Sequence, residues 1–307
     1  MRRGGSTGRG GWFPAWFWPS FAAPAAIWLL LFFVLPFYVV LSVAFGTLDQ
    51  IFLTAKPVYN PAMWDVTTLR GVVSNMFTSG SIEQETLLRT LAYVGMATAA
   101  CLLIGYPVAY FIARHARRTK AFFLIAFIAP FWISYMMRMF AWVNLLQPDG
   151  YVNRALTGLG ILGEPRLWLN GKPSTVIFGL IYGYVPFMIL PLYGTLDRIE
   201  RSTVEASRDL GAGQIRTFTR VTLPLSRQGI LAGCIIVALP MFGDYFTQTL
   251  LASTRQTAMF GNLIVASIES SLVNTGASLV ILMLLLLILP MLYYLRSTNV
   301  ARELAQR

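Results

Sequence analysis

Residues 277–295 read ASLVILMLLLLILPMLYYL, an apolar run without a single charged residue. About 20 such residues in a helix span the hydrocarbon core of a bilayer. Five further runs of the same kind precede it in the chain. They cover residues 21–45, 87–113, 121–146, 175–196 and 221–246. The sequence therefore predicts an all-α membrane protein with six transmembrane helices.

The composition of the whole chain agrees with a membrane location. Hydrophobic residues make up 56% of the 307 residues and charged residues only 12%, with a mean hydropathy of +0.62, whereas a soluble domain carries about 25% charged residues. Cys101 and Cys234 lie inside apolar runs and are read as core residues. The single histidine, His115, stands in a basic run, which argues against a His-based metal site or a Ser-His-Asp triad. The chain is therefore expected to hold neither catalytic residues nor a metal.

The positive charge of the chain indicates its orientation in the membrane. Lys and Arg number 24 against 13 Asp and Glu, a net charge of +11. The excess lies in four segments that share one side of a six-span protein. These segments are the N-terminus, residues 114–120, residues 197–227 and the C-terminal tail. By the positive-inside rule that side is the cytoplasm, so both termini are expected there. Topology accounts for the whole excess and no nucleic-acid-binding module is visible, so no nucleic acid partner is expected.

The least membrane-like of these segments is the loop at residues 198–220. Ser202 and Glu205 have the spacing of a capping box and predict a short helix that ends at Gly211, where the left-handed conformation suits glycine. Gly213 and a second helical segment leading to Pro224 follow. Such a helix could serve as the contact for a force-generating partner. The alternative is a connecting loop whose arginines only enforce the topology.

The spacing within this loop resembles the permease signature of binding-protein-dependent ABC importers. That signature reads E-A-A, three residues, G, nine residues, I-x-L-P; here Ser207 replaces the second alanine and Val221 the isoleucine. The resemblance implies a type I ABC importer permease fold, working by alternating access in the bacterial cytoplasmic (inner) membrane. It also implies a coupling helix that docks on a cytoplasmic ATPase. The residues assigned to this coupling are Glu205, Ala206, Ser207, Asp209, Leu210, Gly211, Leu223 and Pro224.

A narrower resemblance extends from about residue 28 to residue 296. Residues 103–111, 130–138, 150–153 and 185–193 are similar to the first permease subunit of spermidine/putrescine-type importers. This resemblance implies a polyamine, spermidine or putrescine, or a related small nitrogenous solute as the cargo. The partners it implies are a second six-span permease subunit, a cytoplasmic ABC ATPase dimer, a periplasmic or lipid-anchored solute-binding protein, and membrane lipid.

ATP hydrolysis is expected to come from a separate subunit. The chain contains no Gly-x-x-x-x-Gly-Lys-Ser/Thr stretch, so it cannot form a phosphate-binding P-loop. ATP and Mg are therefore assigned to the partner ATPase, and this chain is expected to be a transport subunit without a cofactor or enzymatic activity of its own. The expected domains are a cytoplasmic N-terminal segment (1–20), the transmembrane permease domain (21–296) and a cytoplasmic tail (297–307).

Two other function classes compete with this interpretation. A self-contained secondary transporter or channel would need an internal repeat and coupling-ion carboxylates near the midplane. No convincing repeat is present, and Asp244 is the only acid expected within a span. A membrane enzyme would need a constellation of His, Asp or Glu at one rim of the spans, and none is visible.

Two charged residues within the expected spans, Arg138 and Asp244, mark a tentative substrate path, because intramembrane charges are costly and commonly functional. Asp244 could attract an ammonium group, with cation–π contacts from nearby aromatic rings. Alternatively, Arg138 pairs with Asp244, or snorkels outward, and only holds the helices together. The residues of the tentative path are Trp132, Tyr135, Arg138, Trp142, Asp244 and Tyr245.

The glycine pairs of two spans predict close helix packing. Gly179 and Gly183 lie in the fourth span, and Gly229 and Gly233 in the fifth. The expected outer loops, about residues 46–86, 147–174 and 247–276, are long enough to contact a binding protein. Their exposed aromatic residues are more typical of loop packing than of docking. These residues are Tyr59, Trp64, Tyr151 and Trp168.

Overall fold

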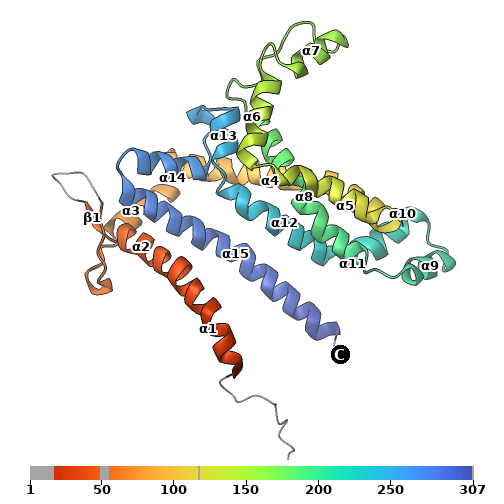
Figure 1. The fold of residues 1–307 in the computed structure, drawn as a ribbon, viewed down its shortest axis with the longest axis horizontal. Helices are drawn as coiled ribbons and strands as arrows, with labels where there is room; N and C mark the ends of the chain where they lie inside the picture. The colour runs from red at the N-terminus through yellow and green to blue at the C-terminus, as the bar shows by residue number, and fades with distance from the viewer. Residues whose placement is uncertain (1–16, 49–54, 117, 306–307) are drawn as a thin grey trace, which may run out of the picture.

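The computed structural model describes residues 17–48, 55–116 and 118–305, which are mainly helical (Figure 1). The first elements are α1 (Phe17–Leu29), η1 (Leu30–Val34), α2 (Leu35–Ala44), β1 (Thr47–Leu48), β2 (Ala55–Lys56), η2 (Pro61–Met63), α3 (Thr67–Phe77), α4 (Ile82–Arg114), α5 (Lys120–Ile128), η3 (Ala129–Trp132), α6 (Tyr135–Leu146) and α7 (Tyr151–Gly158). They are followed by α8 (Pro173–Leu196), α9 (Arg201–Asp209), α10 (Gln214–Thr217), η4 (Phe218–Thr222), α11 (Leu223–Leu225), α12 (Arg227–Phe242), α13 (Phe246–Leu251), η5 (Arg255–Thr257), α14 (Phe260–Glu269) and α15 (Val273–Ala305). The two short strands pair antiparallel, with Thr47 opposite Lys56.

Four helices are long and apolar enough to cross a membrane on their own. They are Ser20–Ala44, which joins α1, η1 and α2, then Ile82–Arg114, Pro173–Leu196 and Val273–Ser297. Two further candidates are bent pairs, Lys120–Trp132 with α6 and Gln214–Leu225 with α12. Among the described residues the predicted number of six spans is reached when each bent pair counts as one.

The expected spans at residues 121–146 and 221–246 each consist of two helices joined at a bend. The first pair is bent by 86°, and Ile133 and Ser134 at the break depart from helical backbone, with ψ angles of 135° and 139°. The second pair is bent by 61° at Ser226. Moreover, α12 ends at Phe242, so Asp244 lies in the turn beyond the helix.

The centre of the bundle is formed by α4, α8 and α12, which share one hydrophobic core. The glycines of α8 and α12 lie where other helices approach closely. A Cβ atom at position 183 would come within 2.6 Å of the Tyr135 ring, and one at position 233 within 2.6 Å of the Met188 sulfur. One at position 179 would come within 2.5 Å of both Thr247 and Leu251. The predicted packing role of these glycines is confirmed.

Replacing Gly229 with alanine is expected to destabilise the bundle. The new Cβ would lie 2.5 Å from the Thr195 hydroxyl oxygen and 3.0 Å from the Pro191 carbonyl oxygen, and such overpacking costs about 1–3 kcal/mol. The matched control is Gly194→Ala, because Gly194 lies in α8 with open space around its Cβ position. The midpoint of thermal denaturation should fall for the first variant and stay level or rise for the second. Equal shifts would contradict the close approach at Gly229.

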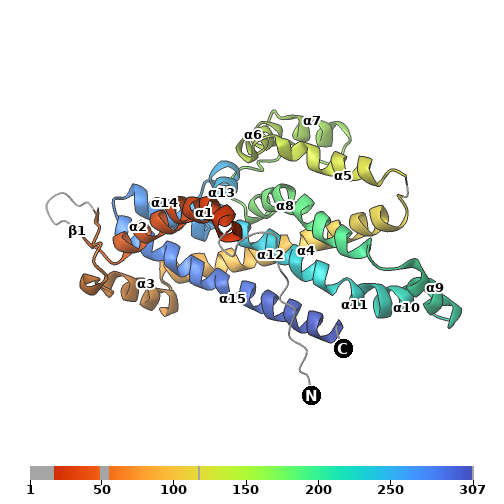
Figure 2. The same cartoon turned by 60° about the horizontal axis from the view of Figure 1, so that its bottom comes forward.

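The bundle has two distinct ends. Figure 2 shows α9 at one end and both α3 and α14 at the other, which we call the α9 end and the α14 end. The basic segments 114–120 and 197–227 meet at the α9 end, where Arg114 donates a hydrogen bond to the Ile199 carbonyl. Most of the predicted segment 1–20, and residues 306–307, lie outside the described residues, so the cytoplasmic location of both termini stays a prediction.

The aromatic residues of the expected outer loops divide into two groups. Trp64 stacks on Phe45 and donates its indole N–H to a backbone carbonyl at 2.8 Å, and Trp168 donates to the Asn153 side chain at 2.9 Å. The prediction of loop packing is confirmed for both tryptophans. Tyr59 and Tyr151 are exposed.

Candidate functional site

The predicted short helix in the loop at residues 198–220 is present as α9, but it begins differently from the prediction. Glu200 has extended backbone and is the residue that precedes the first helical turn. Ser202 lies inside the helix, and its hydroxyl donates to the Glu200 carboxylate at 3.1 Å. The capping box between Ser202 and Glu205 is therefore wrong, because the chain turns into the helix two residues before Ser202.

The end of α9 agrees with the prediction. Gly211 has a φ of +81° and donates its N–H to the Arg208 carbonyl at 2.8 Å. The next amide, that of Ala212, donates to the Ser207 carbonyl at 3.1 Å. These two bonds form a Schellman motif, which satisfies the last carbonyls of the helix and requires a left-handed residue at Gly211.

The surface of α9 is largely uncovered by the rest of the chain. Leu210 is 89% exposed, and Glu205, Ala206 and Asp209 are exposed as well. The half-buried Ser207 donates a hydrogen bond to the Thr217 hydroxyl at 3.0 Å. Ser207, which replaces the alanine of the signature, thus ties α9 to α10. The helix is held through Ser207 and leaves the apolar Leu210 and the carboxylates of Glu205 and Asp209 exposed.

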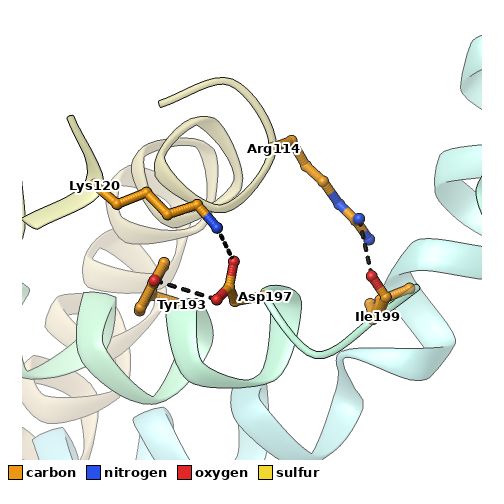
Figure 3. A network of polar contacts seen from close by, with 5 residues as sticks. All are labelled: Arg114, Lys120, Tyr193, Asp197 and Ile199. Atoms are coloured by element: carbon orange, nitrogen blue, oxygen red, sulfur yellow. Dashed lines mark hydrogen bonds and ion pairs between the residues drawn. The ribbon is translucent and has the colours of Figure 1, made fainter. Parts of the chain in front are cut away.

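A polar network fixes the base of α9 (Figure 3). Lys120, at the start of α5, forms an ion pair with Asp197, at the end of α8. The Tyr193 hydroxyl donates to the second oxygen of Asp197 at 3.3 Å. Arg114, the last residue of α4, donates to the Ile199 carbonyl at 3.0 Å. The segment entering α9 is therefore bonded to α4, α5 and α8 at once.

The second candidate region surrounds Asp244, whose buried carboxylate is bonded on both oxygens. One oxygen accepts the Thr247 amide at 3.0 Å. The other accepts the hydroxyls of Thr247 and Tyr135 at 2.7 Å and of Tyr184 at 3.3 Å. The carboxylate thus joins α6, α8 and α13 through charge-assisted hydrogen bonds. Tyr184 and Thr247 were not predicted, because no spacing pattern in the sequence distinguishes them from ordinary helix residues.

Arg138 does not form an ion pair with Asp244, which was one of the two alternatives predicted for it. Among the described residues the only ion pair is the one between Lys120 and Asp197. Arg138 also does not snorkel, since only 7% of it is exposed. Its guanidinium carbon lies 4.1 Å from the centroid of the Phe131 ring and 5.4 Å from that of Tyr135, and its Nε and Nη1 atoms are buried without an acceptor. Arg138 and Asp244 therefore both lie against Tyr135, one near its ring and the other at its hydroxyl, and form no ion pair with each other.

The other three residues of the tentative path lie apart from this cluster. Trp132 is 82% exposed. Trp142 packs edge-on against Phe178 and lines a cavity of about 390 Å³ between α6 and α8. Tyr245 lines a separate cavity of about 780 Å³ between α4, α13 and α14. Of the six predicted residues, the structure brings together Tyr135, Arg138 and Asp244. In the described part of the chain, no group of His, Cys, Asp and Glu could hold a metal ion.

Comparison with known sequences gives consistent matches along most of the chain. A family model described as "Binding-protein-dependent transport system inner membrane component" matches residues 84–298. The spermidine/putrescine transport system permease protein PotB of Escherichia coli (strain K12) is 32% identical over 244 residues, covering 77% of this chain and 81% of that protein. The PotB protein of Haemophilus influenzae is 35% identical over 237 residues, covering 77% and 78%.

Two solved structures share the fold. One is a bacterial ABC transporter involved in the import of the acidic polysaccharide alginate, with a TM-score of 0.69, 19% identity, and coverage of 92% of this chain and 95% of that one. The other is a bacterial alginate ABC transporter in complex with an alginate pentasaccharide-bound periplasmic protein, with a TM-score of 0.69, 18% identity and coverage of 91% and 92%. At these identities the similarity concerns the fold alone.

Proposed function

The chain belongs to the family of binding-protein-dependent transport system inner membrane components, and from that premise we propose that it is one permease half of a polyamine importer. The predicted type I importer permease fold and the multi-pass location in a bacterial inner membrane are confirmed by the family and by the shared fold. The chain is a transport component and not an enzyme. The similarity to spermidine/putrescine permeases over most of both chains supports the choice of cargo.

The other proposed partners would supply the importer functions that this chain lacks. Because the chain has no P-loop, a separate ATPase dimer would bind ATP and Mg and hydrolyse the ATP. A second permease subunit would complete the transmembrane pathway. A solute-binding protein in the periplasm would deliver the polyamine. The four basic segments support a cytoplasmic α9 end and a periplasmic α14 end. Residues 21–296 would then form the permease domain between two cytoplasmic termini.

We assign ATPase docking to α9. Its uncovered surface, which includes Leu210 and the carboxylates of Glu205 and Asp209, is suited to a partner with an apolar cleft and basic side chains. Ala206 would allow close approach, while Ser207 and Gly211 fix the shape of the helix. The remaining two coupling residues lie in α11 and would carry the movement to α12. These residues are Leu223 and Pro224.

The cargo path is proposed to pass the cluster of Tyr135, Arg138 and Asp244. Both charges lack a counter-ion in direct contact, so the wall of the path would present both signs to a passing solute. Trp142 and Tyr245 would contribute aromatic faces at the two cavities, and the exposed Trp132 a further one at the break before α6.

Purification and flux measurements test the proposal. The chain, expressed from its native operon, should co-purify with a second six-span subunit and an ATPase. In liposomes the complex should take up radiolabelled spermidine or putrescine only when ATP and the binding protein are both present. Ion-driven flux by the chain alone would instead support a secondary transporter. If the same ATP-dependent complex takes up a different solute and no polyamine, the proposed cargo is wrong and the proposed importer function stands.

A further inference from the structure

One face of α4 is bonded to the segment that surrounds α9. Tyr106, Tyr110 and Arg114 are spaced four residues apart, so they lie on the same face of this 33-residue helix. Arg114 holds the entry to α9, as described above. Both tyrosine rings pack edge-on against Phe218, with centroids 5.7 and 6.0 Å apart. The Tyr106 hydroxyl also lies 2.9 Å from the Ser226 hydroxyl, at the bend between α11 and α12.

The other end of α4 is bonded to the loop between α13 and α14. One guanidinium nitrogen of Arg89 donates to the carbonyls of Arg255 at 3.1 Å and Ala258 at 3.2 Å. The fully buried Thr90 hydroxyl accepts the amide of Phe260 at 2.8 Å. Phe260 is the first residue of α14, so its amide has no partner within its own helix. A side chain of α4 therefore caps α14.

We propose that α4 is a rigid link between α9 and the loop that walls the cavity of about 780 Å³ at the α14 end, with Arg89 and Thr90 as its positioning residues at that end. Ile82–Arg114 is one helix of about 50 Å. Its one proline, Pro107, lies between Tyr106 and Tyr110, so the proline-free part of the link runs from Thr90 to Tyr106, and its buried face packs along α8. The inference rests on the proposed function, because it takes α9 as the segment that the ATPase moves.

The bonds at the two ends favour joint movement over sliding. If α4 shifted relative to the loop at 253–260, the Phe260 amide would lose its acceptor while buried, which costs far more than a solvent-exposed hydrogen bond. The same helix supplies four of the cavity's lining residues. A displacement of α4 at the α9 end would therefore carry this loop and its side of the cavity along with the helix, and the cavity would face the binding protein in the proposed orientation. The four residues are Ile82, Glu85, Thr86 and Arg89.

Hydrogen exchange of the complete importer in nanodiscs tests this link. Exchange is compared without nucleotide and with ATP plus vanadate, in peptides covering residues 201–211 and 253–262. Trapping the nucleotide state is expected to change exchange in both segments, by about fivefold or more. In Thr90→Val the nucleotide-dependent change should persist at 201–211 and be lost at 253–262. Thr90→Ser, which keeps the hydroxyl, should restore it. The control is Leu88→Ala, since Leu88 is 58% exposed.

The outcomes separate this inference from the proposed function. No response at 201–211 in the wild-type complex would mean that α9 is not the docking helix, and the proposed function would fail at that point. A response at 201–211 without one at 253–262 in the wild type would overturn the link alone. The link would be overturned equally by an unchanged response at 253–262 in Thr90→Val, whatever the stability of that variant.

Discussion

Replacing Leu210 with aspartate is expected to abolish ATP-driven uptake while the permease remains folded in the membrane. Leu210 is 89% exposed and lies outside the hydrophobic core, and such surface substitutions change stability by about 0.5 kcal/mol or less. In the proposed complex, however, a carboxylate would replace the central apolar contact of the docking surface. A central contact of this kind is worth about 2 kcal/mol or more, roughly a thirtyfold loss of affinity. The measurement is the amount of ATPase that co-purifies with the permease.

Phe77→Asp is the matched control for this measurement. Phe77 is 81% exposed at the end of α3, near the opposite end of the bundle, so the change introduces the same charge on an equally exposed apolar residue. This variant should retain its ATPase. If Leu210→Asp also retains the ATPase, with ATP hydrolysis that still responds fully to the loaded binding protein, α9 does not couple the two subunits.

Local chemistry explains which parts of α9 could be predicted from the sequence. The end at Gly211 was predictable because a left-handed residue strongly favours glycine, and the structure has a φ of +81° there. The start was not, because several residues near Ser202 can precede a helix and the choice depends on where α8 delivers the chain. That position is set by Asp197 and Ile199 through bonds to α5 and α4, which are distant in the sequence.

In the membrane spans, too, some features could be predicted from the sequence and others could not. Apolar length predicted the helices of the first, second, fourth and sixth runs, since bilayer thickness sets that length. Hydropathy does not report a bend, so the breaks at Ile133 and Ser226 were missed. Hydropathy also gives no sharp helix end, so the apolar run was extended through Asp244 although α12 ends at Phe242. Its true partners, the hydroxyls of Tyr135, Tyr184 and Thr247, come from three elements that only the tertiary structure brings together.

Asp244→Ala is expected to be among the most destabilising single changes in the chain. It removes a buried carboxylate that accepts four hydrogen bonds and leaves the donors of Tyr135, Tyr184 and Thr247 without their acceptor. Hydrogen bonds to a charged group contribute about 1.5–3 kcal/mol each. Because the hydroxyls can pair with one another after the change, we expect a net loss of about 3 kcal/mol. The midpoint of thermal denaturation in detergent measures this loss.

Asp244→Asn separates the architectural role of this residue from a role in transport. Asparagine keeps the shape and one acceptor oxygen, which can still receive the Thr247 amide, so most of the stability should remain. It also removes the negative charge from the wall of the proposed path. One charge at about 8 Å contributes about 2 kcal/mol at an effective dielectric constant of about 20, so polyamine uptake per folded molecule should fall at least about tenfold. Unchanged uptake at full expression would exclude Asp244 from the path and leave it as the joint between α6, α8 and α13.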